Sequence, residues 1–166
     1  DCIIFPDHSY ELTAPKENFI ENLSLCFPQE KDAIVRYVDI LDRVARAARG
    51  FFAAKALPGV LGSIAEATLS RKFHSLSDRT TEEVLSELTA NPRLQGVLSG
   101  QWGDYGLPQA NSSFAMQALV VRHFFHGGYY PIGGSSVIAI RLLKKVADSG
   151  GWTRICADVS QIIIEK

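Results

Sequence analysis

The chain has 166 residues, of which 46% are apolar and 21% charged, and its formal net charge is −1. This composition is typical of a globular domain and excludes intrinsic disorder. The balanced charge argues against a nucleic-acid binder, which would normally carry a basic face. A chain of this length favours one domain with a substantial core.

The three cysteines, Cys2, Cys26 and Cys156, are odd in number and far apart, which favours free thiols in a reducing compartment. No run of 18 apolar residues is present, so we expect a cytoplasmic or peripheral membrane location without a transmembrane segment. The chain begins with Asp1 instead of Met and ends on a strand-like run at residues 162–166. We therefore expect it to be a piece of a longer protein.

The first third predicts a β-hairpin followed by two helices. Extended residues flank turn chemistry within residues 2–12, which is typical of a hairpin. Thr13 is a candidate N-cap for a helix that runs to about Leu25. Pro28 breaks this helix and starts the longest one, predicted from about Gln29 to Ala56.

The long predicted helix is amphipathic. Its apolar residues recur at three- and four-residue spacing, and its other face carries charges of both signs. We interpret this face as solvated and not as a basic binding surface. Its charged residues are Lys31, Asp32, Arg36, Asp39, Asp42, Arg43 and Arg46.

Three shorter helices are predicted before residue 100. A weaker apolar pattern covers residues 59–73. Thr80 and Glu83 have the spacing of a capping box, in which each side chain bonds the other residue's backbone N–H. Asn91 and Pro92 open another helix, which leads into a turn at Gly100.

Residues 101–134 hold six of the 13 glycines and organise the middle of the chain. Glycines punctuate a Trp-Gly-Asp-Tyr-Gly turn, after which Asn111 or Ser112 is expected to cap a helix at residues 113–126. Gly127 and Gly128 end that helix, and a second glycine pair turns the chain into the next one. We expect these aromatic, glycine-bounded turns to line a pocket for a flat, apolar ligand.

The C-terminal part predicts a helix that begins at Ser135 or Ser136, followed by two strands at residues 152–156 and 159–164. The predicted fold class is therefore α+β, mostly helical, with a small mixed or antiparallel sheet.

Each local motif for catalysis has a simpler interpretation. The turn at Gly133 and Gly134 could hold an anion at a helix start, but the full dinucleotide pattern is absent. His123 and His126 could form half of a metal site, although we favour a structural role at the helix end. Asp104 could be a catalytic acid, but a turn residue that bonds its own backbone is the favoured interpretation.

A longer match is more specific. Trp-Gly-Asp-Tyr-Gly-Leu-Pro at residues 102–108, Ser-Ser-Phe at 112–114 and Gly-Gly-Tyr-Tyr-Pro at 127–131 occur in this order, followed by the pair at 133–134. This segment resembles the phytoene desaturase-like FAD-dependent oxidoreductases, and within them the retinol saturase and carotenoid isomerase branch. A weaker resemblance covers the whole chain.

The resemblance implies an FAD-dependent oxidoreductase that acts on carotenoid or retinoid-like polyenes. Residues 1–166 would be its substrate-binding domain, with most of the FAD-binding segments outside this chain, so the chain alone is expected to be inactive. The pocket for a polyene should be apolar and aromatic because the ligand has almost no hydrogen-bonding groups. The implied substrate-binding residues are Trp102, Tyr105, Phe114, Tyr129 and Tyr130. The implied cofactor-binding residues are Gly128, Gly133, Gly134 and Val159.

Two alternatives remain open. One is a non-enzymatic helical module that binds an apolar ligand or a partner protein, and the other is a metal-dependent enzyme that uses His123 and His126. If the chain is part of an FAD-dependent oxidoreductase, its expected partners are the polyene and the FAD-binding domain of the same parent chain. Exposed apolar faces would also favour self-association, or membrane association of the parent.

Overall fold

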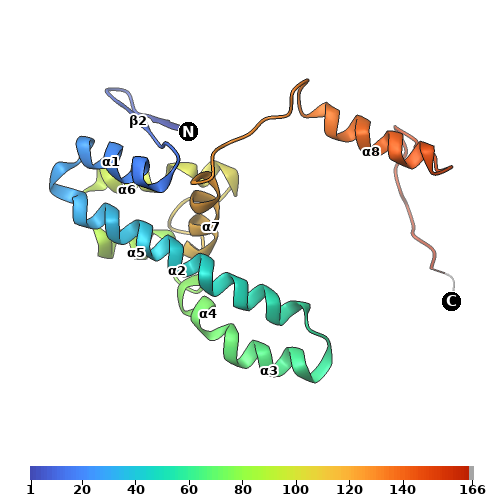
Figure 1. Ribbon diagram of the computed structural model, residues 1–166, viewed down its shortest axis with the longest axis horizontal. Coiled ribbons are helices and arrows are strands. Elements are labelled where there is room, and N and C mark those ends of the chain that lie inside the picture. Colours follow the sequence, from blue (N-terminus) through green and yellow to red (C-terminus); the bar gives the residue numbers. More distant parts are fainter. Residues whose placement is uncertain (165–166) are drawn as a thin grey trace. The chain divides into compact units, whose positions relative to one another are not determined.

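The structure is a computed structural model that describes residues 1–164. The chain divides into two compact units, Asp1–Gly127 and Gly128–Lys166, and each is described by itself. The first unit contains one β-hairpin and most of the helices (Figure 1), and the second contains α8. In the first unit the elements are β1 (Cys2–Ile4), β2 (Ser9–Glu11), α1 (Lys16–Cys26), η1 (Pro28–Glu30), α2 (Lys31–Ala56), α3 (Gly59–Leu69), α4 (Arg71–Ser77), α5 (Thr81–Leu88), α6 (Pro92–Leu98), η2 (Gly100–Asp104) and α7 (Phe114–Phe124).

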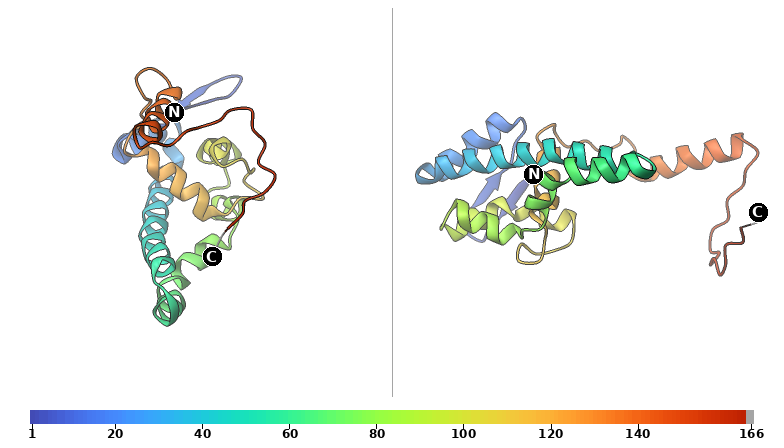
Figure 2. Two further views of the ribbon diagram at one scale, coloured as in Figure 1. Left: turned by 90° about the vertical axis from the view of Figure 1, so that its right-hand side faces the viewer. Right: turned by 90° about the horizontal axis from the view of Figure 1, so that it is seen from below.

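Helix α2 is the central element of the first unit. It contacts α1, α3, α4, α5 and α7, and the views in Figures 1 and 2 show its length running through the unit. Ile34, Tyr37, Leu41 and Val44 recur at three- and four-residue spacing and are fully buried. Burial of each such side chain contributes on the order of 1.5–3 kcal/mol, so the predicted amphipathic helix is also the core of the unit.

The predicted hairpin is confirmed. β1 and β2 pair antiparallel with Ile3 opposite Tyr10. The buried Tyr10 ring stacks on Phe27, with centroids 5.2 Å apart, and its hydroxyl accepts a 3.0 Å hydrogen bond from Nε of Arg93. These contacts join the hairpin to the end of α1 and the start of α6.

Two of the predicted helix starts are confirmed. The Thr80 hydroxyl accepts from the backbone N–H of Glu83, and the Glu83 carboxylate accepts from the backbone N–H of Thr80, which completes the capping box of α5. The Asn91 side chain accepts from the backbone N–H groups of Arg93 and Leu94 at the start of α6.

Two other predicted caps are wrong. Pro15 and not Thr13 precedes α1, because the Thr13 hydroxyl instead accepts a 2.8 Å bond from the Asn22 side chain. Ser113 precedes α7 in place of Asn111 or Ser112. The Ser112 hydroxyl does not cap α7, because it forms a 2.7 Å hydrogen bond with the hydroxyl of Thr81, which lies 31 residues earlier.

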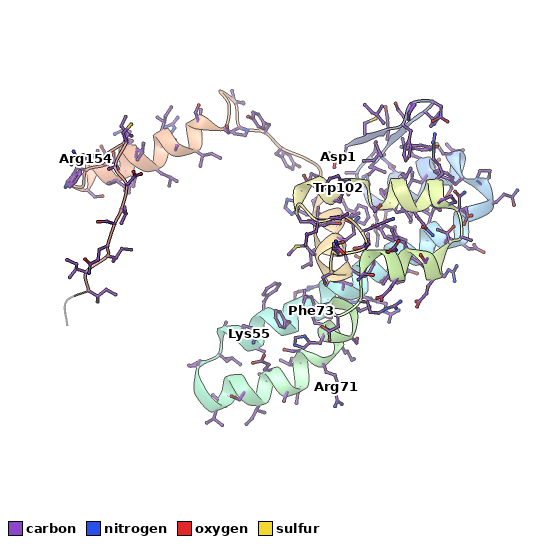
Figure 3. The ribbon with its side chains drawn as sticks, turned by 180° about the vertical axis from the view of Figure 1, so that it is seen from behind. Asp1, Lys55, Arg71, Phe73, Trp102 and Arg154 are labelled. Carbon is purple, nitrogen blue, oxygen red and sulfur yellow. The ribbon has the colours of Figure 1, made fainter. Side chains whose placement is uncertain are left out.

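The region between residues 59 and 77 forms two helices where the sequence predicted one. α3 ends at Leu69, and α4 begins at Arg71. The Phe73 ring of α4 (labelled in Figure 3) stacks on Phe51 of α2, with ring centroids 4.6 Å apart, and this contact packs α4 against α2.

The second unit contains α8 (Ser136–Asp148), which confirms the last predicted helix. The two strands predicted at residues 152–156 and 159–164 are wrong, because residues 151–164 form no regular secondary structure. A strand is stabilised by ladder hydrogen bonds to a neighbouring strand, and no partner strand is described in this unit. Large apolar side chains in this stretch, including Trp152, Ile155 and Ile162, are exposed.

The described chain is thus mostly helical with one small antiparallel sheet, and the predicted α+β class is confirmed. Among residues 1–164, none of the helices combines the length and the hydrophobicity needed to cross a bilayer.

Candidate functional site

A tight turn after η2 positions the first two aromatic residues of the predicted site. The Trp102 carbonyl accepts hydrogen bonds from the backbone N–H groups of Tyr105 (3.3 Å) and Gly106 (2.8 Å). Gly106 has φ +83°, a conformation that side-chain-bearing residues rarely adopt. The turn leaves the Trp102 side chain 48% exposed, while Tyr105 is partly buried.

A buried polar network fixes Tyr105. Its hydroxyl donates a 2.6 Å hydrogen bond to Oε1 of Gln117, a fully buried residue of α7. The Gln117 amide donates to the Leu98 carbonyl (2.7 Å) and to the Tyr37 hydroxyl (3.3 Å). The Tyr37 hydroxyl donates to the same carbonyl at 3.0 Å, and burial raises the pKa of Tyr37, so it remains a neutral donor. The network connects η2, α2, α6 and α7.

Sequence reasoning missed Gln117 because an amide within an apolar helical run carries no local signal of its partners. Those partners come from positions 12 to 80 residues away. Buried amides need such partners, since an unpaired one costs about 1–3 kcal/mol.

Phe114 is fully buried at the start of α7. Its ring meets the Tyr37 ring edge-on, with centroids 6.4 Å apart and planes at 68°. In the described structure it is a core residue that packs against Tyr37 of this network, and its role as a substrate-binding residue stays a prediction.

The remaining predicted residues lie in the second unit. Tyr129 and Tyr130 are 91% and 75% exposed and precede a turn in which Gly133 and Gly134 have φ of +92° and +87°. A Cβ on Gly134 would meet no atom within 4 Å, whereas one on Gly133 would lie 3.0 Å from Val137. The backbone is therefore open at Gly134, where a flat ring such as a flavin could approach it, but it is crowded by Val137 at Gly133.

The two other cofactor candidates are also in the second unit. Gly128 precedes the tyrosine pair, and Val159 is exposed in a stretch without regular secondary structure. The structure therefore gathers Trp102, Tyr105 and Phe114 within the first unit, while the tyrosines and the cofactor candidates lie in the second.

The metal interpretation gains no support. His123 is exposed beside the Phe124 ring, and His126 lies at the edge of a charged pocket. Within residues 1–164, no three His, Cys, Asp or Glu side chains come together as a metal-ligating group. Cys2, Cys26 and Cys156 are free and exposed.

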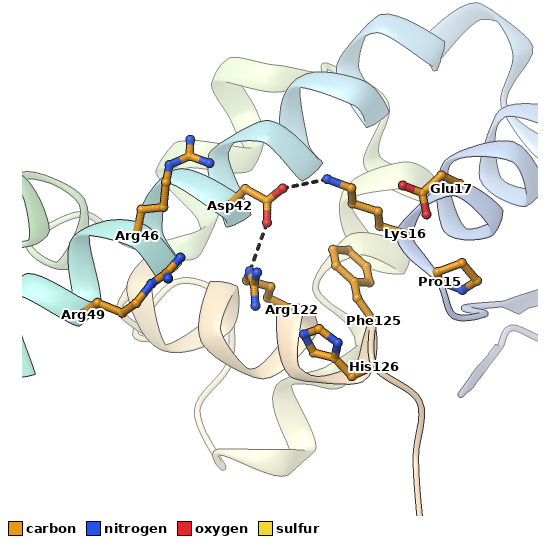
Figure 4. A pocket seen from close by; sticks show the side chains of 9 residues that line it. All are labelled: Pro15, Lys16, Glu17, Asp42, Arg46, Arg49, Arg122, Phe125 and His126. Carbon is orange, nitrogen blue, oxygen red and sulfur yellow. Dashed lines mark hydrogen bonds and ion pairs between the residues drawn. The ribbon is translucent and has the colours of Figure 1, made fainter.

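A pocket of about 340 Å³ in the first unit was not expected from the sequence (Figure 4). Asp42 of α2 lies at its centre and accepts 3.0 Å hydrogen bonds from Nζ of Lys16 and Nε of Arg122. Partial burial raises the pKa of Asp42, but these two cations outweigh it and hold the pKa below its usual value. The other lining residues are Pro15, Glu17, Arg46, Arg49, Phe125 and His126.

The Asp42 carboxylate joins α2 to α1 and α7 through its bonds to Lys16 and Arg122. It therefore has a structural role that the sequence did not reveal. The expectation of a simply solvated face is incomplete at this position, because the partners of Asp42 are supplied by α1 and α7. Arg46 and Arg49 line the same pocket without a hydrogen-bond or ion-pair partner in the described chain.

Comparisons with known proteins show that the chain is similar to part of several proteins named all-trans-retinol 13,14-reductase. It is 31% identical over 159 residues to an all-trans-retinol 13,14-reductase of Danio rerio and 32% identical over 161 residues to that of Homo sapiens. The matches cover 93% and 95% of this chain, but only 26% of each relative. A Danio rerio protein named inactive all-trans-retinol 13,14-reductase is 27% identical over 161 residues, again 95% of the chain and 26% of the relative.

No protein-family profile matches the chain. No solved structure matches it either. The chain spans about a quarter of the length of the curated relatives it matches. It is a homologue of the all-trans-retinol 13,14-reductases over nearly its whole length, and the predicted resemblance to the retinol saturase branch is confirmed.

Proposed function

We propose that this chain is the substrate-side segment of an FAD-dependent oxidoreductase that desaturates, saturates or isomerises a carotenoid or retinoid-like polyene. The observation that carries the proposal is the similarity of 93–95% of the chain to reductases named for all-trans-retinol. The segment by itself is proposed to be inactive, because the relatives are about four times as long as the region it matches.

The aromatic residues support an apolar ligand. A polyene offers almost no hydrogen-bonding groups, so its binding depends on apolar area removed from water, about 25 cal/mol per Å². Trp102 presents half of its side chain to solvent, and the tyrosine pair presents most of its surface. Under this proposal Trp102, Tyr105, Tyr129 and Tyr130 contact the substrate, and Phe114 supports them from the core.

The network around Gln117 would hold the substrate-binding turn in place. Tyr105 bonds Gln117 of α7 at 2.6 Å, and Gln117 bonds the Leu98 carbonyl of α6 at 2.7 Å. These bonds would hold the backbone of the turn that also contains Trp102. Fixed aromatic walls lose little entropy on binding, and this favours affinity for a long ligand.

When bound, FAD would supply the hydride or electron transfer that no side chain of this chain offers. Gly128, Gly133, Gly134 and Val159 are proposed to lie against it with their backbone. The open space beside Gly134 supports this role, because a ring could approach the backbone there without displacing a side chain.

The experiment is a measurement of flavin content. The full-length protein and the isolated 166-residue chain are purified, and flavin absorbance is compared with protein concentration before and after FAD is added. We expect about one flavin per molecule of full-length protein and none retained by the isolated chain. Absence of flavin from the full-length protein, or tight stoichiometric binding by the isolated chain, would contradict the proposal.

A second candidate is a non-catalytic member of the same family. The observation that favours it is the inactive Danio rerio relative, which matches the chain over the same 95% of its length. A full-length protein that binds flavin and the polyene but leaves the polyene chemically unchanged would support this second candidate over the first.

A further inference from the structure

The pocket in Figure 4 has walls from three helices that are held together by ion pairs. Asp42 of α2 lies between Lys16 of α1 and Arg122 of α7, at 3.0 Å from each. These partners are 26 and 80 residues away from Asp42 in the sequence, so the pairs fix distant elements around the pocket. Its volume of about 340 Å³ lies near the lower end of the roughly 300–1,000 Å³ range of small-ligand pockets and suits a compact ligand.

Two arginines of this pocket have no partner. Arg46 and Arg49 are three residues apart on α2, which makes them neighbours on the helix surface, and both line the pocket. Within residues 1–164, neither forms a hydrogen bond or an ion pair. Each carboxylate oxygen of Asp42 is already bonded to another cation. The forked donors of both arginines therefore remain available to an oxyanion.

The start of α1 adds positive potential to the same pocket. Pro15, which precedes the helix, lines the pocket and offers no side-chain cap. The Thr13 hydroxyl is engaged by the Asn22 side chain instead. The first N–H groups of α1 therefore lack a side-chain acceptor, and they carry the positive end of the helix dipole. An uncapped helix start beside two unpaired arginines favours an anionic ligand.

The charge of the lining indicates which anion fits. When His126 is left out of the count, four cations face two carboxylates, which leaves an excess of two positive charges. A phosphomonoester carries a charge of about −1.5 to −2 near neutral pH and would neutralise this excess, whereas a carboxylate would neutralise half of it. The counted residues are Lys16, Arg46, Arg49 and Arg122 against Glu17 and Asp42.

We propose that this pocket binds the phosphate group of a small, water-soluble phosphorylated molecule, with Arg46 and Arg49 as its charged donors. The proposal goes beyond the oxidoreductase function and does not depend on the flavin chemistry. A phosphate fits better than an acidic side chain from another segment of the parent chain, because one such carboxylate would leave a positive charge unpaired in the pocket.

The test is isothermal titration calorimetry of the flavin-loaded, full-length protein with inorganic phosphate, at an ionic strength held constant with chloride. We expect about one phosphate per molecule with a Kd on the order of 1 mM, as two charge-assisted contacts would give. Arg46→Gln/Arg49→Gln should weaken binding at least about tenfold. Arg46→Lys/Arg49→Lys keeps the charge but loses the forked geometry, so its Kd should lie between the two.

A matched control separates the pocket from a general loss of charge. Lys31→Gln/Arg43→Gln removes two exposed cations of the same helix that do not line this pocket, and it should bind phosphate like the wild type. Flavin content and polyene turnover of every variant are recorded, so that loss of phosphate binding is distinguished from loss of the oxidoreductase function.

Two further probes distinguish the sources of the phosphate. Adenosine 5′-monophosphate represents a soluble metabolite, and dihexanoyl phosphatidic acid represents a lipid headgroup on a short, soluble tail. We expect the nucleotide to bind at least as tightly as inorganic phosphate. Binding of the lipid at least about tenfold more tightly than the nucleotide would assign the pocket to a headgroup and overturn the proposal.

Three other outcomes would also overturn it. The first is no saturable phosphate binding by the wild type, which would mean that another segment covers the arginines in the full-length protein. The second is binding by Arg46→Gln/Arg49→Gln equal to that of the wild type, which would place the phosphate elsewhere. The third is binding only after the flavin has been removed, which would assign the arginines to the pyrophosphate of the cofactor.

Discussion

The Tyr105 hydroxyl donates a 2.6 Å hydrogen bond to the side-chain oxygen of Gln117, across 12 residues and from a surface turn into the core. This bond connects a residue predicted to contact substrate with a buried network that also includes Tyr37. The stability of the first unit and the geometry of the turn at residues 102–106 should therefore both depend on the Gln117 side-chain amide.

Replacement of Gln117 by leucine should lower the free energy of unfolding by about 2–3 kcal/mol, because the Tyr105 hydroxyl loses its acceptor and part of the network is broken. Urea denaturation of the 166-residue chain measures this. Met116→Leu, a half-exposed neighbour on α7, is the control and should stay within about 0.5 kcal/mol of the wild type. Equal stability of Gln117→Leu and Met116→Leu would show that the network contributes nothing.

Asp42→Asn should lower the free energy of unfolding by about 1 kcal/mol near neutral pH, as expected for partly solvated ion pairs. The pKa of Asp42 is lowered in the folded chain, so its contribution is present above the unfolded pKa of about 3.9. That contribution is lost as the pH falls through the still lower folded pKa.

The difference between wild type and Asp42→Asn should therefore be constant above about pH 5 and shrink below about pH 4. Unfolding in urea at a series of pH values checks this. The pKa of Lys16 is raised by its bond to Asp42, so at the alkaline end the pair weakens only as the pH rises above the ordinary lysine range. A difference that instead grows on acidification would be inconsistent with the lowered pKa of Asp42.

Thr80 and Ser70 each precede a helix, and only Thr80 caps its helix with its side chain, so the two offer a matched comparison. Thr80→Ala removes a capping-box bond and should lower the free energy of unfolding by about 1 kcal/mol. Ser70 precedes α4 without a side-chain cap, and its buried hydroxyl has no hydrogen-bond partner. Ser70→Ala should therefore be neutral or slightly stabilising. Thermal unfolding of both variants checks the pair, and the reverse order would contradict the structure.

Trp102 and Phe114 should differ in what they control. Trp102→Ala removes a half-exposed ring, so we expect little loss of stability but at least a tenfold loss of kcat/KM for a polyene in the full-length protein. Phe114→Ala empties a fully buried position and should cost about 3–5 kcal/mol of stability. Normal turnover by a folded Trp102→Ala variant would remove this residue from the proposed site.

The parts of the fold that sequence reasoning predicted are those with local causes. The capping box at Thr80 and the break at Pro28 follow from residues within one helical turn, and the structure has both. The partners of Gln117 and Asp42 come from distant elements, so composition and spacing did not reveal them. The strands predicted at residues 152–164 fail for the same reason, since a strand requires a neighbour as well as a suitable sequence.

The candidate site was predictable only in part. The glycine-bounded turns at Gly106 and Gly134 were recognisable because left-handed backbone requires glycine, and both have positive φ. Burial of Phe114 was not recognisable, because an aromatic residue at a helix start fits a pocket wall and a core position equally well.

The most direct test of the central claim is chromatography of the polyene after anaerobic incubation with the full-length protein, with its flavin oxidised in one sample and reduced in the other. The account predicts that all-trans-retinol or a related polyene is converted to a new product in at least one flavin state. Quantitative recovery of unchanged polyene from a flavin-loaded, folded protein in both states would contradict the proposed activity.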